Sequence, residues 1–397
     1  GGADRLDVTA NMREAEITIP ELNVTKSKGQ PATLTLSGRV EGEALTAIMG
    51  LNLRSDALTL NGGRIGLTPS GRLMSASFDA IRTDTNTARL KAERENTSTP
   101  LKILITGEQF DATPFLDGDR DEGEDGTGGE KDSYRINLEV DRLITGPGRS
   151  INTVLAYLET NSAGHTTRLE MDALVGSGAL QVRYDPGQQP FSLRLEAEDA
   201  GATLKAFGLY DYMVKGRLVI LGQPMRQGAI EDVQGRATIT DFSISEAPIL
   251  AKLFNALSIS GLFDMLGNSN NLSFTRLESD FTWVNDPRGG IYTFNDGAVR
   301  GNSMGLTFSG AINQQTKTTD ITGTAVPVSA INSIISRIPL IGDILTGGDG
   351  GGLIAATFTL SGPSDDPVAS VNLLSVLAPG IIRRILFERE GGDTTQT

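Results

Sequence analysis

Alternation between apolar and polar residues, repeated over many short segments, constrains this chain more than any other feature. Across residues 168–173, for example, Arg, Glu and Asp alternate with Leu, Met and Ala. Successive side chains of a strand point to opposite faces of its sheet, so each such segment predicts a strand with one apolar and one polar face. Roughly twenty segments of this kind follow one another, which predicts a mainly β protein.

Turn signals separate these segments at short intervals. Residues 28–29, 61–63 and 69–71 are Gly-containing turns in the first part of the chain. The strands between them recur every ~8 to 12 residues, a spacing typical of antiparallel β structure. Residues 133–197 repeat the pattern, and residues 274–326 predict a four-strand meander.

Helical periodicity is confined to a few short segments, at residues 199–212, 248–266 and 331–338. Their apolar residues recur at intervals of three and four, so we expect short amphipathic helices, two of them near the C-terminal end. Ordinary packing explains such apolar stripes. The alternative is that they close one end of the sheet or dip into a membrane surface.

Charge and residue usage narrow the functional classes. The formal net charge is −14, which disfavours nucleic-acid binding because that function needs a basic surface. The chain has no cysteine, which excludes disulfides and thiolate metal sites and agrees with a periplasmic protein that does without disulfides. No run of 18 apolar residues occurs, so no segment predicts a membrane-spanning helix.

An acidic, Gly-rich stretch interrupts the strands at residues 117–132. Its first aspartates resemble a calcium loop, but Glu122 and Gly128 stand where the EF-hand pattern needs Gly and Glu. We therefore expect a flexible insertion without a metal site, and the alternative is a weak calcium site. The predicted division is an N-terminal β segment (1–116), this loop (117–132), a C-terminal β region with the amphipathic helices (133–387) and a disordered tail (388–397).

Little in the sequence supports a catalytic function. His165 is the only histidine, and it lies in an expected turn, so no triad or multi-histidine zinc site can form. The glycines of residues 347–352 follow a helical pattern and lack the Lys-Ser/Thr of a phosphate loop. We expect neither an enzyme nor a bound cofactor. Carboxylates are plentiful but nothing in the sequence pairs them, so a carboxylate-based hydrolase is the remaining alternative.

A sheet with one apolar face must bury that face. A second sheet could cover it, the sheet could close into a barrel, or the sheet could curve into a trough that a ligand fills. Periodicity alone does not separate these three arrangements.

Several short motifs lie close together in the C-terminal half. They are Val326-Pro327, Asn332, the run 338–345 (IPLIGDIL), Thr346-Gly347-Gly348, Ser361-Gly362 with Asp366-Pro367, and Leu377-Ala378-Pro379-Gly380 with Arg383-Arg384. Together with residues 247–253 and 257–262, this combination resembles the C-terminal region of the AsmA-like family, especially its large YhdP-type members. The similarity covers about residues 190–387. Leu373 and residues 268–273 depart from the family pattern.

The resemblance implies a long antiparallel meander curved into a U-shaped hydrophobic groove, a β-taco, that holds lipid acyl chains. It implies a conduit module for phospholipid transport between the inner and outer membranes of Gram-negative bacteria. It also implies periplasmic localisation, an inner-membrane helix upstream of residue 1, and contact with the outer membrane or its proteins at the C-terminal end. The alternatives are an outer-membrane assembly factor that carries no lipid and, less favoured because aromatics are scarce, a carbohydrate-binding β-solenoid.

Alternating apolar positions are the candidates for the groove lining: Leu193, Leu195, Leu218, Ile220, Met304, Leu306, Phe308, Phe358 and Leu360. The alternative is that they fill an ordinary sandwich core, and one β-bulge would reverse the choice of face. The basic apolar tail supplies the candidates for membrane contact: Ile381, Ile382, Arg383, Arg384, Leu386 and Phe387. A solvated helix end explains the tail equally well.

Overall fold

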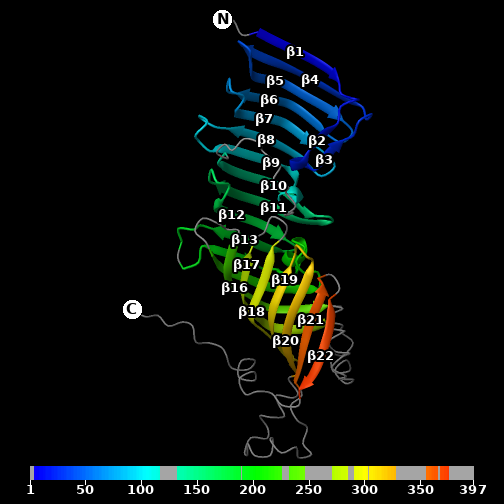
Figure 1. Cartoon of the computed structure of the whole chain (residues 1–397), viewed down its shortest axis with the longest axis vertical. Coiled ribbons are helices and arrows are strands. Elements are labelled where there is room, and N and C mark those ends of the chain that lie inside the picture. Colours follow the sequence, from blue (N-terminus) through cyan, green and yellow to red (C-terminus); the bar gives the residue numbers. More distant parts are fainter. Residues whose placement is uncertain are drawn as a thin grey trace, which may run out of the picture. The chain divides into compact units, whose positions relative to one another are not determined.

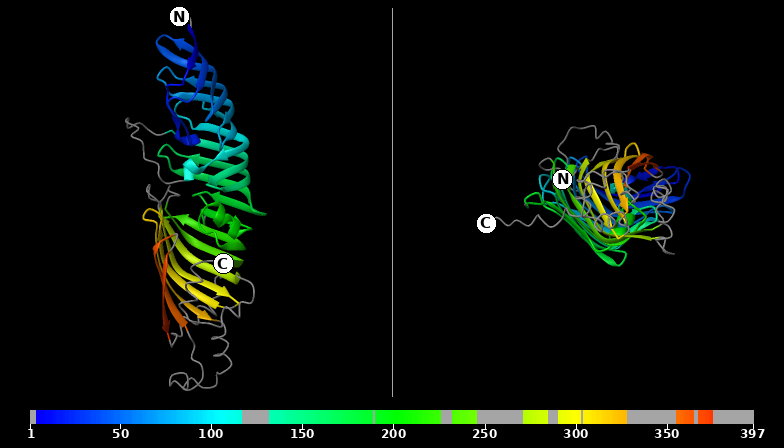
Figure 2. Two further views of the ribbon diagram at one scale, coloured as in Figure 1. Left: turned by 90° about the vertical axis from the view of Figure 1, so that its right-hand side faces the viewer. Right: turned by 90° about the horizontal axis from the view of Figure 1, so that it is seen from below.

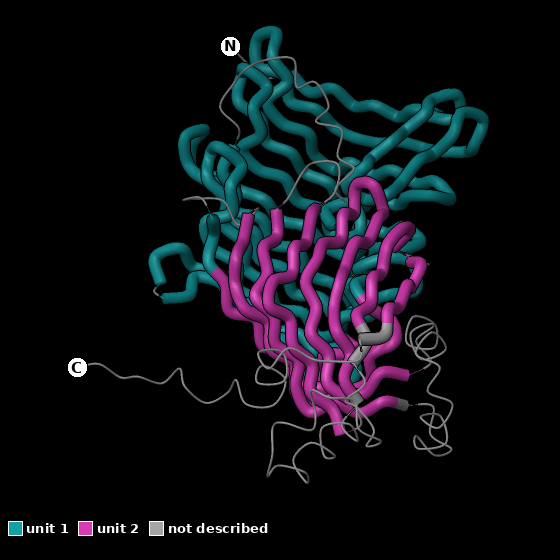
Figure 3. Tube along the Cα trace, turned by 60° about the horizontal axis from the view of Figure 1, so that its bottom comes forward, with its two compact units in different colours: residues 1–197, 203–209, 223–230 teal, residues 198–202, 210–222, 231–397 magenta. Residues whose placement is uncertain are grey.

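A computed structural model describes residues 4–116, 132–188, 190–225, 232–245, 271–284, 290–302, 304–327, 355–364 and 367–374. These residues form 22 strands, two short α-helices and one 3-10 turn (Figure 1). The chain divides into two compact units (Figure 3): unit 1 comprises residues 1–197, 203–209 and 223–230, and unit 2 comprises residues 198–202, 210–222 and 231–397. The predicted domain boundaries stay a prediction.

Unit 1 is a sheet of strands that neighbour one another in chain order. The strands are β1 (Asp4–Asn11), β4 (Ala32–Glu41), β5 (Ala44–Ser55), β6 (Thr59–Leu67), β7 (Leu73–Arg82), β8 (Thr87–Glu93), β9 (Leu101–Asp111), β10 (Tyr134–Gly146), β11 (Arg149–Thr160), β12 (Thr166–Val175), β13 (Gly178–Tyr184) and β14 (Leu193–Ala197). Every pair but one is antiparallel, as in β1–β4 and β13–β14. Most of these antiparallel neighbours are joined by short turns, whereas residues 12–31 connect β1 to β4.

One step of this sheet is parallel, which differs from the predicted meander. Tyr134 pairs with Leu101 and Ile144 with Asp111, so β9 and β10 run in the same direction. Parallel neighbours need a long crossover connection, and residues 112–133 provide it here. It begins with α1 (Thr113–Leu116), a helix that the sequence did not predict.

A small hairpin forms a cap on unit 1. It consists of β2 (Ile17–Ile19), the 3-10 turn η1 (Pro20–Leu22) and β3 (Val24–Lys26). Its Val24 packs in a core cluster with Leu53 and Leu58. The cap therefore covers one end of the apolar face of β4–β6.

Unit 2 contains the remaining strands: β15 (Met213–Pro224), β16 (Asp232–Ser245), β17 (Asn271–Val284), β18 (Ile291–Gly301), β19 (Met304–Asn313), β20 (Thr318–Pro327), β21 (Ala355–Pro363) and β22 (Val368–Leu374). The strand pairings from β16 to β22 are all antiparallel. The predicted four-strand meander is confirmed as β17–β20.

The predicted helix at residues 199–212 is shorter than expected. It is α2 (Ala200–Ala206), and it ends where Gly208 adopts a left-handed φ of 69°. The predicted helices at residues 248–266 and 331–338 lie outside the described residues.

The expected fold class is confirmed, because the described chain is mainly β and follows a curved antiparallel meander. Within each unit the sheet is twisted and curved (Figure 2). In the described part of the chain, β1 pairs with β4 and β22 pairs with β21, and neither unit closes into a barrel.

Candidate functional site

An unbroken line of register partners crosses every main strand of unit 1. We call it row A, and its twelve members are Leu6, Gly38, Ile48, Ile65, Ala76, Ala92, Ile103, Ile136, Leu158, Leu169, Tyr184 and Leu193. Register partners share one face of a sheet, so row A is a continuous stripe without a charged side chain. A second stripe, row B, runs beside it: Phe78, Leu90, Ile105, Leu138, Ala156, Met171, Val182 and Leu195.

The side chains of row A are mostly half-buried. Eight of the twelve fall in this class, and Leu6 is 51% exposed. In a sandwich, a second sheet packed ~10 Å away would cover such a stripe to the close-packed density of a protein interior. The exposure therefore favours an open apolar face over a sandwich core in unit 1.

The opposite face of unit 1 carries ion pairs. Arg5–Asp7 and Lys91–Glu93 are each 3.0 Å apart along one strand. Other pairs cross between strands: Arg135 Nε donates to Glu159 Oε1 at 2.9 Å, and Arg183 contacts both oxygens of Asp172 at 2.7 Å. Exposed pairs add little stability, but they fix which face meets water.

Unit 2 has a matching stripe. Row C consists of one register partner from each strand of β16–β22: Ile239, Leu277, Val299, Leu306, Ala325, Ala356 and Leu373. All seven residues are apolar. The periodicity of unit 2 thus produces one apolar face, as in unit 1.

Aromatic rings on this face reach over glycines of neighbouring strands. A Cβ atom added at Gly297 would lie 2.5 Å from Phe308 Cε1, and one at Gly301 would lie 2.7 Å from Phe274 Cδ1. Phe358 covers Gly323 in the same way. The rings fill space that the missing side chains leave, and they occupy part of the apolar face themselves.

The structure places each described groove candidate on an apolar face or at its end. Leu193 ends row A and Leu195 ends row B in unit 1. In unit 2, Leu306 belongs to row C. Met304 and Phe308 lie two residues before and after it on β19, so they share its face. Phe358 and Leu360 follow Ala356 on β21 at the same alternation. Leu218, Met304 and Phe358 are buried, and the other six are half-buried.

The remaining pair lies on β15. A Cβ atom at Gly216 would meet Phe242 Cβ, and one at Gly235 would meet Gly222 Cα. Leu218 and Ile220 lie between Gly216 and Gly222, at every second residue of the strand. All four residues therefore share one face of β15, which is the face of Phe242. The six membrane-contact candidates of the tail lie outside the described residues, as do the glycines of residues 347–352.

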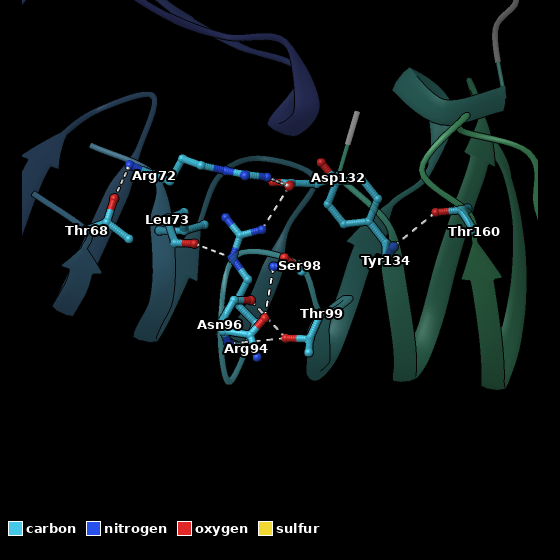
Figure 4. Close-up of polar contacts among 10 residues, drawn as sticks. All are labelled: Thr68, Arg72, Leu73, Arg94, Asn96, Ser98, Thr99, Asp132, Tyr134 and Thr160. Carbon is cyan, nitrogen blue, oxygen red and sulfur yellow. Dashed lines mark hydrogen bonds and ion pairs between the residues drawn. The ribbon is translucent and has the colours of Figure 1, made fainter. Parts of the chain in front are cut away.

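Sequence reasoning missed a polar cavity of about 460 Å³ in unit 1, which we call the rim cavity. Two arginines converge there on one carboxylate (Figure 4): Arg94 Nη1 and Arg72 Nη2 lie 2.8 and 2.5 Å from Asp132 Oδ1. Burial raises the pKa of Asp132, but hydrogen bonds from the two guanidinium groups outweigh it, so the pKa lies below its usual value. The residues come from separate turns, so no local pattern marks them.

A second polar cavity, of about 420 Å³, lies on the charged face of unit 2. Arg236 binds both carboxylate oxygens of Asp280 there, at 2.7 and 3.1 Å. The group is internally ion-paired, and we assign it no ligand.

Other chemistry is sparse in the described part of the chain. No group of three or more His, Asp or Glu side chains there is arranged to hold a metal ion. His165 lies in the β11–β12 turn as predicted. The residue is half-buried, and its backbone N–H donates to Asn161 Oδ1 at 3.0 Å. None of the described helices has the length and hydropathy to cross a bilayer. No family model, curated protein or solved structure matches the chain.

Proposed function

We propose that this chain binds lipid acyl chains along the apolar faces of its curved sheets and conducts phospholipid through the periplasm. The observation that carries the proposal is row A, an apolar stripe that twelve strands share without interruption. Its half-buried side chains leave apolar surface for a ligand to cover. The opposite face of the sheet is charged and remains in contact with water.

The energetics suit movement along the stripe. Each methylene transferred from water gains ~0.8 kcal/mol, so a chain of ordinary length binds firmly overall. Neighbouring strands are ~4.8 Å apart, and each offers similar aliphatic contacts. A lipid therefore exchanges one set of contacts for an equivalent set at each step, without a deep energy minimum.

The sequence resemblance supports the cellular setting. It favours transport between the inner and outer membranes of a Gram-negative envelope, an inner-membrane anchor outside this chain, and outer-membrane contact near the C-terminal end. In this proposal the chain has a binding role without a catalytic step.

A second candidate is an assembly factor for the outer membrane that carries no lipid. The rings of Phe308 and Phe358 favour it, because they fill part of the apolar face of unit 2 with the protein's own side chains. The two candidates differ in whether lipid accompanies the folded protein.

Native mass spectrometry with lipid extraction, on protein purified from a bacterial host, tests the proposal. We expect co-purified phospholipid, which decreases when Leu306 and Phe308 are both changed to Asp. Ser309→Asp is the matched control, because Ser309 is exposed on the opposite face of the same strand. Circular dichroism checks that each variant folds. The proposal is contradicted if the folded wild-type protein carries no lipid and does not bind added fluorescent phospholipid. That result favours the assembly factor.

A further inference from the structure

The rim cavity lies where β9 and β10 begin, beside row A. Pro100 and Ser133 line it, and each directly precedes one of the register partners Leu101 and Tyr134. The next register partners on the same face are Ile103 and Ile136, which belong to row A. A path along β9 and β10 therefore leads from a polar cavity onto the apolar face.

The dimensions of this path fit one amphiphile. From Leu101 to Gly107, β9 spans ~20 Å at ~3.3 Å per residue. An acyl chain occupies half of a ~30 Å bilayer core, or ~15 Å. A lipid whose polar group sits in the rim cavity would thus keep its acyl chain on the apolar stretch of β9.

Charge at the cavity favours an anion. Arg94 follows Leu90 and Ala92 at the same alternation, and its side chain is only 1% exposed. Its Nε donates to Leu73 O at 2.6 Å, which fixes the guanidinium. Two guanidinium groups share the single carboxylate of Asp132, so the cluster has a net charge of +1 in a chain of formal charge −14. Arg72 keeps 46% of its side-chain surface exposed and faces the cavity.

Hydroxyl groups complete the lining. Ser98, Ser133 and Thr160 border the cavity, and a hydroxyl can rotate to donate a hydrogen bond to a phosphate oxygen. Glu159 also borders it, but its carboxylate accepts from Arg135 at 2.9 Å and from the Tyr157 hydroxyl at 3.1 Å. The negative charge of Glu159 is thus compensated by Arg135, which lies on the charged face of the sheet.

We propose that the rim cavity binds the phosphate group of a phospholipid whose acyl chains lie along β9 and β10, with Arg72 as the principal contact. This inference rests on the proposed function. It adds a specificity that apolar stripes alone lack, because a lipid without phosphate satisfies the stripes equally well.

Calorimetric titration of the full chain with two soluble lipids tests the inference. The probes are dioctanoyl phosphatidic acid and dioctanoylglycerol, which differ only in the phosphate. We expect the phosphate-bearing probe to bind about tenfold more tightly, since a charge-assisted hydrogen bond contributes roughly that factor. Arg72→Gln should remove this preference and leave dioctanoylglycerol binding unchanged.

Two further variants secure the result. Arg64→Gln is the matched control, because Arg64 is an exposed arginine of unit 1 that pairs with Asp79 on the charged face. It should keep the full preference. Ser98→Asp places a carboxylate in an exposed loop of the cavity and should reduce phosphatidic acid binding even if Arg72→Gln fails to fold.

The outcomes separate the two proposals. Equal binding of both lipids to wild type and Arg72→Gln overturns the phosphate site and leaves acyl-chain binding intact. Binding of neither lipid to wild type contradicts the proposed function itself. Inorganic phosphate is the third probe: if it binds as tightly as phosphatidic acid and depends equally on Arg72, the cavity is a free-anion site and the lipid assignment is wrong.

Discussion

The ring of Phe308 on β19 covers Gly297 of the neighbouring strand β18. Three ring carbons would lie within 2.6 Å of a Cβ atom at Gly297, so the ring occupies the space that any other residue would need. Gly323 on the other side of β19 is likewise the register partner of both Phe308 and Phe358. Glycines and rings therefore alternate across these strands, and each ring extends over the sheet instead of standing away from it.

Substitution of these glycines should destabilise unit 2 to an extent that depends on what the new methyl group meets. At Gly297 it meets the end of the Phe308 ring, which can shift, so we expect Gly297→Ala to cost ~1 to 2 kcal/mol. At Gly310 it meets the backbone of Asp320 and Ile321, which cannot move aside, so Gly310→Ala should cost more. Urea denaturation measures both. Equal midpoints for the two variants would contradict this account.

A charge on row A should remove lipid, whereas the same charge one residue away should not. Ile103 is a half-buried member of row A, and Leu104 is 37% exposed on the other face of β9. We expect Ile103→Asp to lose most co-purifying lipid, because a carboxylate is costly to hold against acyl chains. Leu104→Asp should retain it. Mass spectrometry of the extracted lipid compares the two, and equal retention would show that this face does not bind acyl chains.

Lys26 should hold the cap onto unit 1. Its Nζ donates to the carbonyl oxygens of Met12 at 2.8 Å and Ala15 at 2.5 Å, and the residue is 1% exposed. Lys26→Met keeps the shape but leaves buried carbonyls without a donor, at a cost of ~3 kcal/mol. Hydrogen exchange across residues 12–30 should accelerate. Lys28→Met, at an exposed position, is the control and should leave exchange unchanged.

Stability should fall in acid partly through Asp132. Its pKa is lower in the folded state than the ordinary aspartate value of 3.8, so its contribution to stability is present above that pH and is lost as pH falls through the folded-state pKa. Asp132→Asn should cost ~2 kcal/mol at neutral pH, because Arg94 loses its charged partner. It should also flatten the stability profile below pH ~4. An unchanged profile would assign the acid sensitivity to other carboxylates.

Much of the fold follows from local pattern. Period-2 alternation predicted strands such as β12, and turn residues predicted the β17–β20 meander, because both signals reside in neighbouring residues. The parallel step from β9 to β10 was not predicted. It depends on the crossover of residues 112–133, whose acidic composition gives no information about the direction in which the chain returns.

The candidate site likewise has one part that local residue patterns predict and another part that they do not. Local alternation predicted an apolar face for each strand and all nine groove candidates. The alignment of these faces into rows A, B and C is visible only in the folded sheet, because it depends on the register between paired strands. The rim cavity also forms only in the folded sheet, because its arginines lie 38 and 60 residues from Asp132 in the sequence. Contacts at such separations form only when the sheet brings distant turns to one edge, and local residue patterns do not encode that arrangement.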